Sequence, residues 1–361
     1  MTEEHDKVAI GFVPDHYLTE YHYPGSESVG EVLDDVVGSR GTGPRGILAR
    51  AMLLGGFRFG AVNLQAGVPD TRSVPVLALA GTTHLPAGVQ ATLVEYLRAG
   101  GRLLLAGRVP ERDMTGEPCT VLRDALGLSP LGSLRGTPEF FTSVTAHGWA
   151  APRPETRTGF AELYEPATGE VVLRELSTGH GCGFDIPVGG HEGTGRAVVF
   201  STDYECDLDL WRAAFAALGT KPGLTHTAAI PGVVLLTSTD GAGGRILHAL
   251  NLSGYDQELT IVERGWPLLG GATLRLPGRR ALMLPLDLSL GGLAVAHATA
   301  EPVAVAAGAV TFRALTQGAF VAVRGPVTCT DPRVTVHERE GLTVVAAGGP
   351  GEFTVSRSPG R

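Results

Sequence analysis

The chain has 361 residues, of which 43% are hydrophobic and 18% charged, and its formal net charge is -8. This length exceeds that of a usual single core, so two or three domains are expected, and the apolar content excludes intrinsic disorder. The basic residues form no cluster, which argues against nucleic-acid binding. No apolar run approaches the roughly 20 residues that span a bilayer, the first residues are acidic, and the four cysteines form no Cys-x-x-Cys pair. We therefore expect no membrane partner and a cytoplasmic location.

The first 220 residues alternate strand and helix patterns. Apolar runs predict strands at residues 8–13, 59–64, 74–80, 102–106 and 196–202. Helices are predicted to begin near Pro44 and Pro86, which suit the first helical position, and an apolar stripe predicts a closing helix over residues 208–218. The repeated order of strand, helix and strand predicts an α/β domain with a parallel, doubly wound sheet. Between about 135 and 193 short Val- and Thr-containing pieces alternate with Gly and Pro, which predicts an antiparallel β insertion.

Residues 221–361 have a different, all-β pattern. Short apolar segments recur at near-regular spacing between Gly, Pro and Asp, at residues 233–237, 245–250, 258–262, 272–276 and 280–284. This spacing is typical of a β-sandwich. A further β-rich stretch, residues 302–355, extends the sandwich or forms a second sheet. The predicted organisation is thus an α/β domain at 1–220 and a C-terminal β-sandwich region at 221–361, either continuous or split into small sheets at 221–290 and 300–357.

Two glycine motifs and one ligand-like set have structural interpretations. Residues 41–46 have the letters of a dinucleotide fingerprint, but no strand directly precedes them, so we expect a helix-start loop and no bound cofactor. Gly181-Cys182-Gly183 lacks the spacing of a nucleophile elbow, so Cys182 is expected to be a buried structural thiol. His180, Cys182 and His191 could bind zinc, but three residues without a paired spacing favour the absence of a metal.

Four acidic residues follow the last predicted strand of the parallel sheet: Asp203, Glu205, Asp207 and Asp209. They lie at the carboxyl edge, where doubly wound folds bind ligands, and could hold a cation. Asp207 is also well placed to cap the closing helix, and Asp209 to face its positive end. We favour this role at the start of the helix over cation binding. No glutamate pair lies at the ends of barrel-type strands, so no catalytic residue is predicted.

An aromatic segment follows the first predicted strand, again at the carboxyl edge of the sheet. It carries three of the seven tyrosines of the chain. Aromatic planes stack on the apolar faces of sugars while polar groups bind their hydroxyls, but the same residues equally suit a packed interface, and the interface is favoured. The candidate binding residues are Tyr17, Glu20, Tyr21, His22 and Tyr23.

These segments resemble a known family. Residues 8–15, VAIGFVPD, with Thr19-Glu20-Tyr21, resemble the segment that follows the catalytic barrel in large bacterial β-galactosidases of the barrel-type glycoside hydrolase families. Residues 74–80 and 96–103 are similar to the amidotransferase-like, flavodoxin-type domain that mediates trimerisation in some of these enzymes. A third similarity is to the terminal β domain of such enzymes, and it lies in residues 248–252, 274–277 and 282–285.

The resemblance covers most of residues 8–286, but the barrel that carries the catalytic glutamates in this family has no counterpart in the chain. No catalytic residue can therefore be transferred. The resemblance implies a noncatalytic oligomerisation and substrate-framing portion of a β-galactosidase, with a catalytic barrel in cis or trans, a homo-oligomer, by analogy a trimer, and a galactoside as possible ligand.

Two other functions stay open. An independent enzyme on the amidotransferase-like sheet would need a nucleophile at the carboxyl end of a central strand. Thr82, Thr83 and His84 are in such a position, but threonine without a clear base is a poor nucleophile. A stand-alone carbohydrate-binding protein would rest on the tyrosine segment and the β domain.

Overall fold

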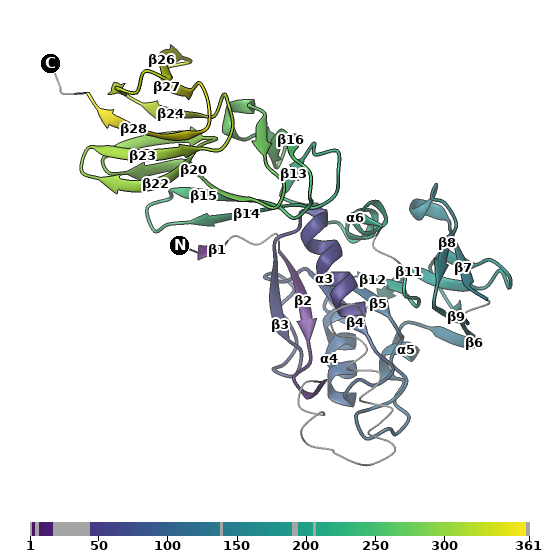
Figure 1. Ribbon diagram of the computed structural model, residues 1–361. Helices are drawn as coiled ribbons and strands as arrows, with labels where there is room; N and C mark the ends of the chain where they lie inside the picture. The colour runs from purple at the N-terminus through teal and green to yellow at the C-terminus, as the bar shows by residue number, and fades with distance from the viewer. Residues whose placement is uncertain are drawn as a thin grey trace, which may run out of the picture. The chain divides into compact units, whose positions relative to one another are not determined.

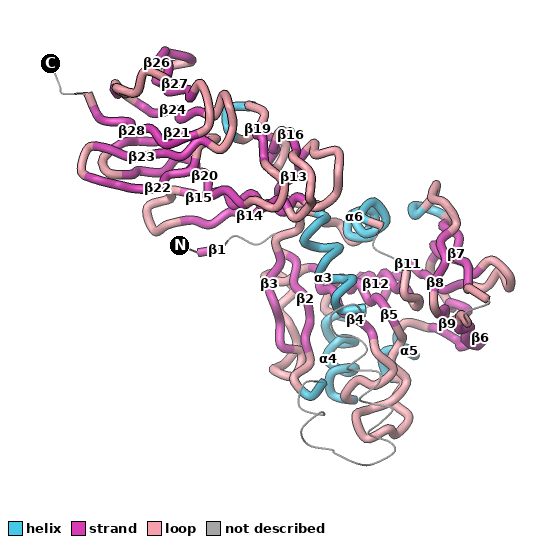
Figure 2. Tube along the Cα trace, viewed as in Figure 1, coloured by secondary structure: helices cyan, strands magenta, loops and turns pink. Residues whose placement is uncertain are grey.

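A computed structural model describes residues 2–3, 7–16, 44–137, 140–189, 194–204 and 207–358. The chain divides into two compact units, His5–Lys221 and Met1–Glu4 with Pro222–Arg361 (Figure 1). Among the described residues, α-helices occur only in the first of these units, whereas the second consists of strands and loops with one short 3-10 turn (Figure 2). No helix in the described ranges has the length and apolar character needed to cross a membrane.

The described residues of the His5–Lys221 unit include five parallel strands: β2 (Val8–Phe12), β3 (Phe59–Asn63), β4 (Val76–Gly81), β5 (Arg102–Gly107) and β12 (Thr194–Phe200). They are ordered β3-β2-β4-β5-β12, and each neighbouring pair is parallel. The five strands predicted from the apolar runs are confirmed. Because β3 and β4 lie on opposite sides of β2, the strand order reverses beside β2.

In the part of the chain that the structure describes, four helices cover this sheet: α3 (Pro44–Gly55), α4 (Ala87–Arg98), α5 (Val121–Ala125) and α6 (Leu208–Ala217). Buried residues of α3 and α6 form one core with Val76 and Ala78 of β4. Those of α4 and α5 form a second core with Leu77 and Leu79. Successive residues of a strand point to opposite faces, so the sheet has a core on each face and its central strands read as continuous apolar runs.

The insertion is antiparallel, as its sequence predicted. Its strands are β6 (Leu128–Arg135), β7 (Thr142–Ala146), β8 (Thr156–Thr158), β9 (Phe160–Pro166), β10 (Glu170–Glu175) and β11 (Gly181–Gly189), with a 3-10 turn η1 (Gly148–Ala150). It joins the parallel sheet through β11, which pairs antiparallel with β12 along the whole of that strand. It begins earlier than predicted, because β6 pairs with β9 from Leu128 onward.

The second unit is built on an eight-stranded antiparallel sheet, ordered β1-β14-β15-β20-β21-β24-β27-β26. Its strands are β1 (Thr2–Glu3), β14 (Val233–Thr239), β15 (Arg245–Asn251), β20 (Ala281–Leu290), β21 (Leu293–Ala298), β24 (Phe320–Arg324), β27 (Leu342–Ala347) and β26 (Val334–Arg339). A four-stranded sheet, β22-β23-β28-β25, shares a core cluster with it. Its strands are β22 (Glu301–Ala306), β23 (Ala309–Ala314), β28 (Gly351–Arg357) and β25 (Val327–Thr328).

Smaller pieces cover the other core cluster of this unit. They are β13 (Leu224–His226), β17 (Ile261–Glu263), β18 (Trp266–Pro267), β16 (Gln257–Leu259), β19 (Leu274–Leu276) and the 3-10 turn η2 (Leu269–Gly271).

One detail of the predicted β region is corrected. The strand predicted at 258–262 is two strands in different sheets, and Thr260 between them bonds to Thr227. Elements of both alternatives left open for 221–361 are present: the β20–β21 hairpin carries the eight-stranded sheet from 221–290 into 300–357, and the four-stranded sheet lies wholly within 300–357.

The predicted N-cap of the closing helix yields a stability test. Asp207 accepts hydrogen bonds from the backbone N–H groups of Asp209 and Leu210, at 3.0 and 3.1 Å. Asp207→Ala should lower the free energy of unfolding by about 1 kcal/mol, the usual contribution of a cap. Asp207→Ser keeps a capping oxygen and should recover most of it. Urea unfolding of both variants measures this, and equal losses would contradict the capping role.

Candidate functional site

The carboxyl ends of β2 and β4 flank the point where the strand order reverses, which is where open α/β sheets bind ligands. Here the side chains of His16, after β2, and His84, after β4, are both buried. His16 Nε2 lies 3.1 Å from the carbonyl oxygen of His84, and Thr82 Oγ1 donates to the same oxygen at 2.6 Å. The polar groups at this point are therefore bonded to each other.

The aromatic segment begins at this point. Asp15 and His16 lie at the carboxyl edge, and the backbone N–H of Asp15 donates to the side chain of Gln65 at 2.9 Å. Tyr17, Glu20, Tyr21, His22 and Tyr23 lie outside the described residues. Their assignment as binding residues stays a prediction.

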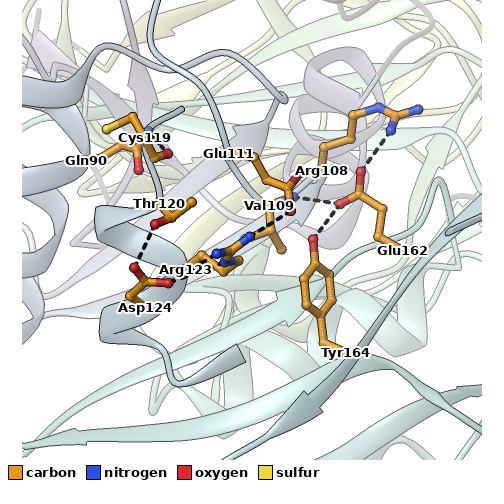
Figure 3. Close-up of polar contacts among 10 residues, drawn as sticks. All are labelled: Gln90, Arg108, Val109, Glu111, Cys119, Thr120, Arg123, Asp124, Glu162 and Tyr164. Carbon is orange, nitrogen blue, oxygen red and sulfur yellow. Dashed lines mark hydrogen bonds and ion pairs between the residues drawn. The ribbon is translucent and has the colours of Figure 1, made fainter. Parts of the chain in front are cut away.

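A second polar cluster lies beyond the carboxyl end of β5, where the insertion meets the parallel sheet (Figure 3). Glu162 of β9 accepts a hydrogen bond from Arg108 Nη1 on one carboxylate oxygen, at 2.8 Å. The other oxygen accepts from the backbone N–H of Val109 at 3.0 Å and from the hydroxyl of Tyr164 at 3.2 Å. The guanidinium of Arg108 also lies over the ring of Phe160, 4.5 Å from its centroid. We call Arg108, Val109, Glu162 and Tyr164 the Glu162 cluster.

A glycine allows this approach. The loop after β5 crosses the end of β4, and the N–H of Arg108 donates to the carbonyl of Gly81 at 3.1 Å. A Cβ atom at Gly81 would lie 2.1 Å from the carbonyl oxygen of Arg108, which is shorter than any real contact. Any other residue at this position would displace the loop that carries Arg108 and Val109.

Burial governs the electrostatics of the cluster. It raises the pKa of the Glu162 carboxyl, while the Val109 N–H and the Arg108 guanidinium act in the opposite direction. Burial, together with the negative charges of Glu162 and Glu111, raises the pKa of the Tyr164 phenol. Tyr164 therefore stays a neutral donor to Glu162 at ordinary pH.

A neighbouring set of groups joins the same loop to α5. Arg123 of α5 forms an ion pair with Glu111 at 3.1 Å, and Thr120 donates to Asp124 at 2.7 Å. Gln90 of α4 donates to the carbonyl of Cys119 at 3.1 Å. These bonds position the 108–124 segment over the carboxyl edge.

The Glu162 cluster is a structural network of hydrogen bonds. A glycosidase acid or nucleophile needs an accessible carboxyl paired with a second one across the substrate. Here both oxygens of Glu162 are engaged, and the nearby carboxylate Glu111 is bonded to Arg123. The arrangement fixes the insertion to the sheet and offers no free catalytic group.

The other predicted sites resolve as follows. Cys182 is completely buried, and burial raises its pKa, so the structural thiol is confirmed. It lies in β11, whereas His191 lies outside the described residues. Residues 41–43 of the glycine motif are also outside them, and α3 begins at Pro44 as expected.

The acidic residues after β12 have separate roles. Asp203 accepts from the N–H groups of Gly159 and Phe160, Asp207 caps α6, and Asp209 lies in the first turn of that helix. The predicted helix electrostatics is thereby confirmed for Asp207 and Asp209. Glu205 lies outside the described residues, within which no three His, Cys, Asp or Glu side chains form a metal-binding group.

The Glu162 cluster was not predicted from the sequence. Its members come from segments more than 50 residues apart, so no local motif joins them. The available signal was a single glutamate among the apolar residues of the strand Phe160-Ala161-Glu162-Leu163-Tyr164. A carboxylate in such a strand implies a partner, but its identity depends on the fold.

Comparisons with known proteins agree with the expected resemblance. Residues 30–147 match the family described as GLMA-like, second domain. An exo-beta-D-glucosaminidase of Thermococcus kodakarensis is 28% identical over 324 residues, which cover 85% of this chain and 38% of the relative. A catalytic mutant of the GH42 β-galactosidase Gan42B from G. stearothermophilus is 13% identical with a TM-score of 0.58, over 79% of this chain and 40% of that one. A β-galactosidase from Rahnella sp. R3 is 17% identical with a TM-score of 0.55, over 78% and 41%.

The chain is thus related to glycoside hydrolases and shares the fold of a part of GH42 β-galactosidases. The predicted resemblance to an accessory portion of such enzymes is confirmed. The chain spans about two fifths of the length of the relatives it matches. Within the described ranges the strands form no closed parallel barrel.

The raised pKa of Glu162 predicts a pH dependence. A carboxyl whose folded pKa is above its unfolded value binds more protons in the folded state, so stability falls as pH rises from the ordinary value of 4.5 through the folded value. Glu162→Gln removes this titration. The free energy of unfolding of the wild type minus that of Glu162→Gln should therefore decrease between about pH 4 and pH 7.

Urea unfolding at both pH values measures this difference. Glu165→Gln is the matched control, because Glu165 lies on the same strand but is exposed. If the free energy of unfolding of the wild type minus that of Glu162→Gln increased with pH, this result would contradict the assigned effect of burial.

Proposed function

We propose that this chain is the noncatalytic oligomerisation and substrate-framing portion of a β-galactosidase-like glycoside hydrolase and acts with a catalytic barrel supplied in cis or in trans. The extent of the fold match supports this. The match to a GH42 enzyme covers 79% of the chain. Neither unit alone contains that many residues, since the larger one, His5–Lys221, holds 217 of the 361. Both units therefore contribute to the match, as expected of one continuous portion of such an enzyme.

We infer that 1–220 is an amidotransferase-like, flavodoxin-type domain with a β insertion and that 221–361 is a β-sandwich region. The strand order β3-β2-β4-β5-β12 supports the first assignment, because it is the flavodoxin order with its helices on both faces. The core cluster shared by the eight- and four-stranded sheets supports the second. A cytoplasmic location is part of the proposal, supported by free thiols at Cys119, Cys182 and Cys329.

The substrate class is a terminal β-linked hexose. The structural neighbours are β-galactosidases and the sequence relative is an exo-β-D-glucosaminidase, so galactosides and glucosaminides are the two substrates to compare. We propose that Tyr17, Glu20, Tyr21, His22 and Tyr23 help to frame that substrate. The position of Asp15 and His16 at the carboxyl edge supports this, because the tyrosines follow directly.

The alternative of an independent enzyme on this sheet is disfavoured. The hydroxyl of Thr82 is bonded to the backbone of its own loop, and the thiol of Cys182 is completely buried with a raised pKa. Neither group meets the requirements of an activated nucleophile.

We expect the purified chain alone to hydrolyse neither a chromogenic β-galactoside nor a chromogenic β-glucosaminide. Activity should appear when the chain is produced together with a barrel encoded directly upstream or by a neighbouring gene. Steady-state assays of the chain, the barrel and their mixture measure this. Turnover by the homogeneous chain that disappears in Glu162→Gln would overturn the proposal, because it would identify a catalytic carboxyl here.

We expect the chain to self-associate, by analogy as a trimer, through the His5–Lys221 unit. Phe140 and Phe141 of the insertion are 52% and 50% exposed, and exposed aromatic residues are typical of interfaces. At a chain concentration of roughly tens of micromolar, Phe141→Glu should shift the sedimentation coefficient toward that of the monomer. Val305→Glu is the matched control, since Val305 is 56% exposed on β22 of the other unit. A wild-type chain that sediments as a monomer would contradict this expectation.

A further inference from the structure

Two hollows adjoin each other in the Pro222–Arg361 unit, and Gly318 lines both. One, of about 280 Å³, lies on a sheet face and is lined by Phe320, two histidines and small or aliphatic residues, together with Arg339 and Glu340; we call it the apolar hollow. The other, of about 590 Å³, is lined by threonines, Gln317 and an ion pair; we call it the polar hollow. The volume of the polar hollow is in the range of sites that bind small molecules, and that of the apolar hollow is just below it.

The floor of the apolar hollow is a row of side chains across four neighbouring strands. His297 of β21 is opposite Ala322 of β24, Ala322 is opposite Val344 of β27, and Val344 is opposite His337 of β26. All four strands are labelled in the upper part of Figure 2. Three strand spacings of about 4.8 Å separate the backbones of the two histidines by about 14 Å. Two imidazoles thus flank a floor of small residues.

An aromatic ring stands beside this floor. Phe320 is half-buried, its opposite residue on β27 is Ala346, and its ring meets that of His297 edge to face at 5.7 Å and 89°. The contact between the rings fixes the orientation of both, while the alanines leave space next to them. A fixed aromatic ring above small residues suits a flat ligand with an apolar face, such as a sugar ring.

The polar hollow supplies hydrogen-bonding groups. Thr273, Thr316 and Gln317 line it, and their side chains form no hydrogen bond to any residue that the structure describes. Hydroxyl and amide groups both donate and accept, which matches the hydroxyls of a saccharide.

The charges that line the two hollows are balanced. Glu258 pairs with Arg275 at 2.8 Å in the polar hollow, and Arg339 pairs with Glu340 at 3.4 Å beside the apolar one. Burial also lowers the pKa of His297, which favours its neutral form. A balanced lining does not select for a charged ligand.

We propose that the two hollows form one groove that binds a neutral oligosaccharide, with one sugar ring against Phe320 and the next hydrogen-bonded by Gln317, Thr273 and Thr316. The groove belongs wholly to the Pro222–Arg361 unit. The proposal makes no choice among neutral sugars and does not rest on the proposed function.

Isothermal titration calorimetry of the full chain tests the groove. The neutral probes are β-1,4-galactotriose and the β-1,4-linked trimer of N-acetylglucosamine, and the charged probes are trigalacturonate and the glucosamine trimer. We expect at least one neutral probe to bind more tightly than both charged ones. Phe320→Ala and Gln317→Ala should each weaken that binding by about tenfold, and Met283→Ala, exposed on β20 outside both hollows, should not.

Gln317→Ala keeps the test decisive if Phe320→Ala is unstable, because Gln317 is exposed. Absence of binding to both neutral probes at about 10 mM, or binding that Gln317→Ala leaves unchanged, would overturn the groove. Tighter binding of a charged probe would overturn the neutral specificity. None of these results depends on a barrel, so they stay separate from the outcome of the hydrolysis and sedimentation experiments.

Discussion

Burial of the parallel sheet on both faces is the constraint on which the His5–Lys221 unit depends. Every residue of β4 is buried, and the helices on either side leave no face of that strand to solvent. Its side chains must therefore be apolar and its backbone groups must pair within the sheet. Polar side chains can emerge only where the strands end. Thr82, His84 and Arg108 consequently gather at the carboxyl edge.

At that edge the insertion brings a carboxylate into a largely dry environment. A buried charge is destabilising unless its oxygens are hydrogen-bonded, and Glu162 meets this condition with donors from Arg108, Val109 and Tyr164. Breaking such a set is more costly than the net contribution of the ion pair, because it leaves a buried charge without a partner. Its main effect is therefore positional, since it joins β9 to the loop after β5.

Much of the fold follows from local patterns in the sequence. The parallel strands could be predicted from apolar runs because both faces of the sheet are buried. Helix α6 and its cap could be predicted from an apolar stripe that follows Asp207. The five-residue helix α5 was too short for its period to be read. The break at Thr260 and the continuity of the eight-stranded sheet depend on which strands pair, and pairing is a tertiary property. For the same reason the sequence did not predict the Glu162 cluster. Nor did it predict the two hollows that share Gly318, because their lining comes from several strands.

The partners of the polar side chains distinguish structural groups from ligand-binding groups. In the His5–Lys221 unit, Glu162, Thr82 and Asp203 have their oxygens engaged by the chain itself. In the described part of the second unit, Gln317 and Thr273 line a hollow and have no such partner. A group bonded within the chain must lose that bond before it can bind a ligand, whereas an open one exchanges only water. On this argument Glu162, Thr82 and Asp203 are structural groups of the α/β unit, whereas Gln317 and Thr273 of the β unit are open to a ligand.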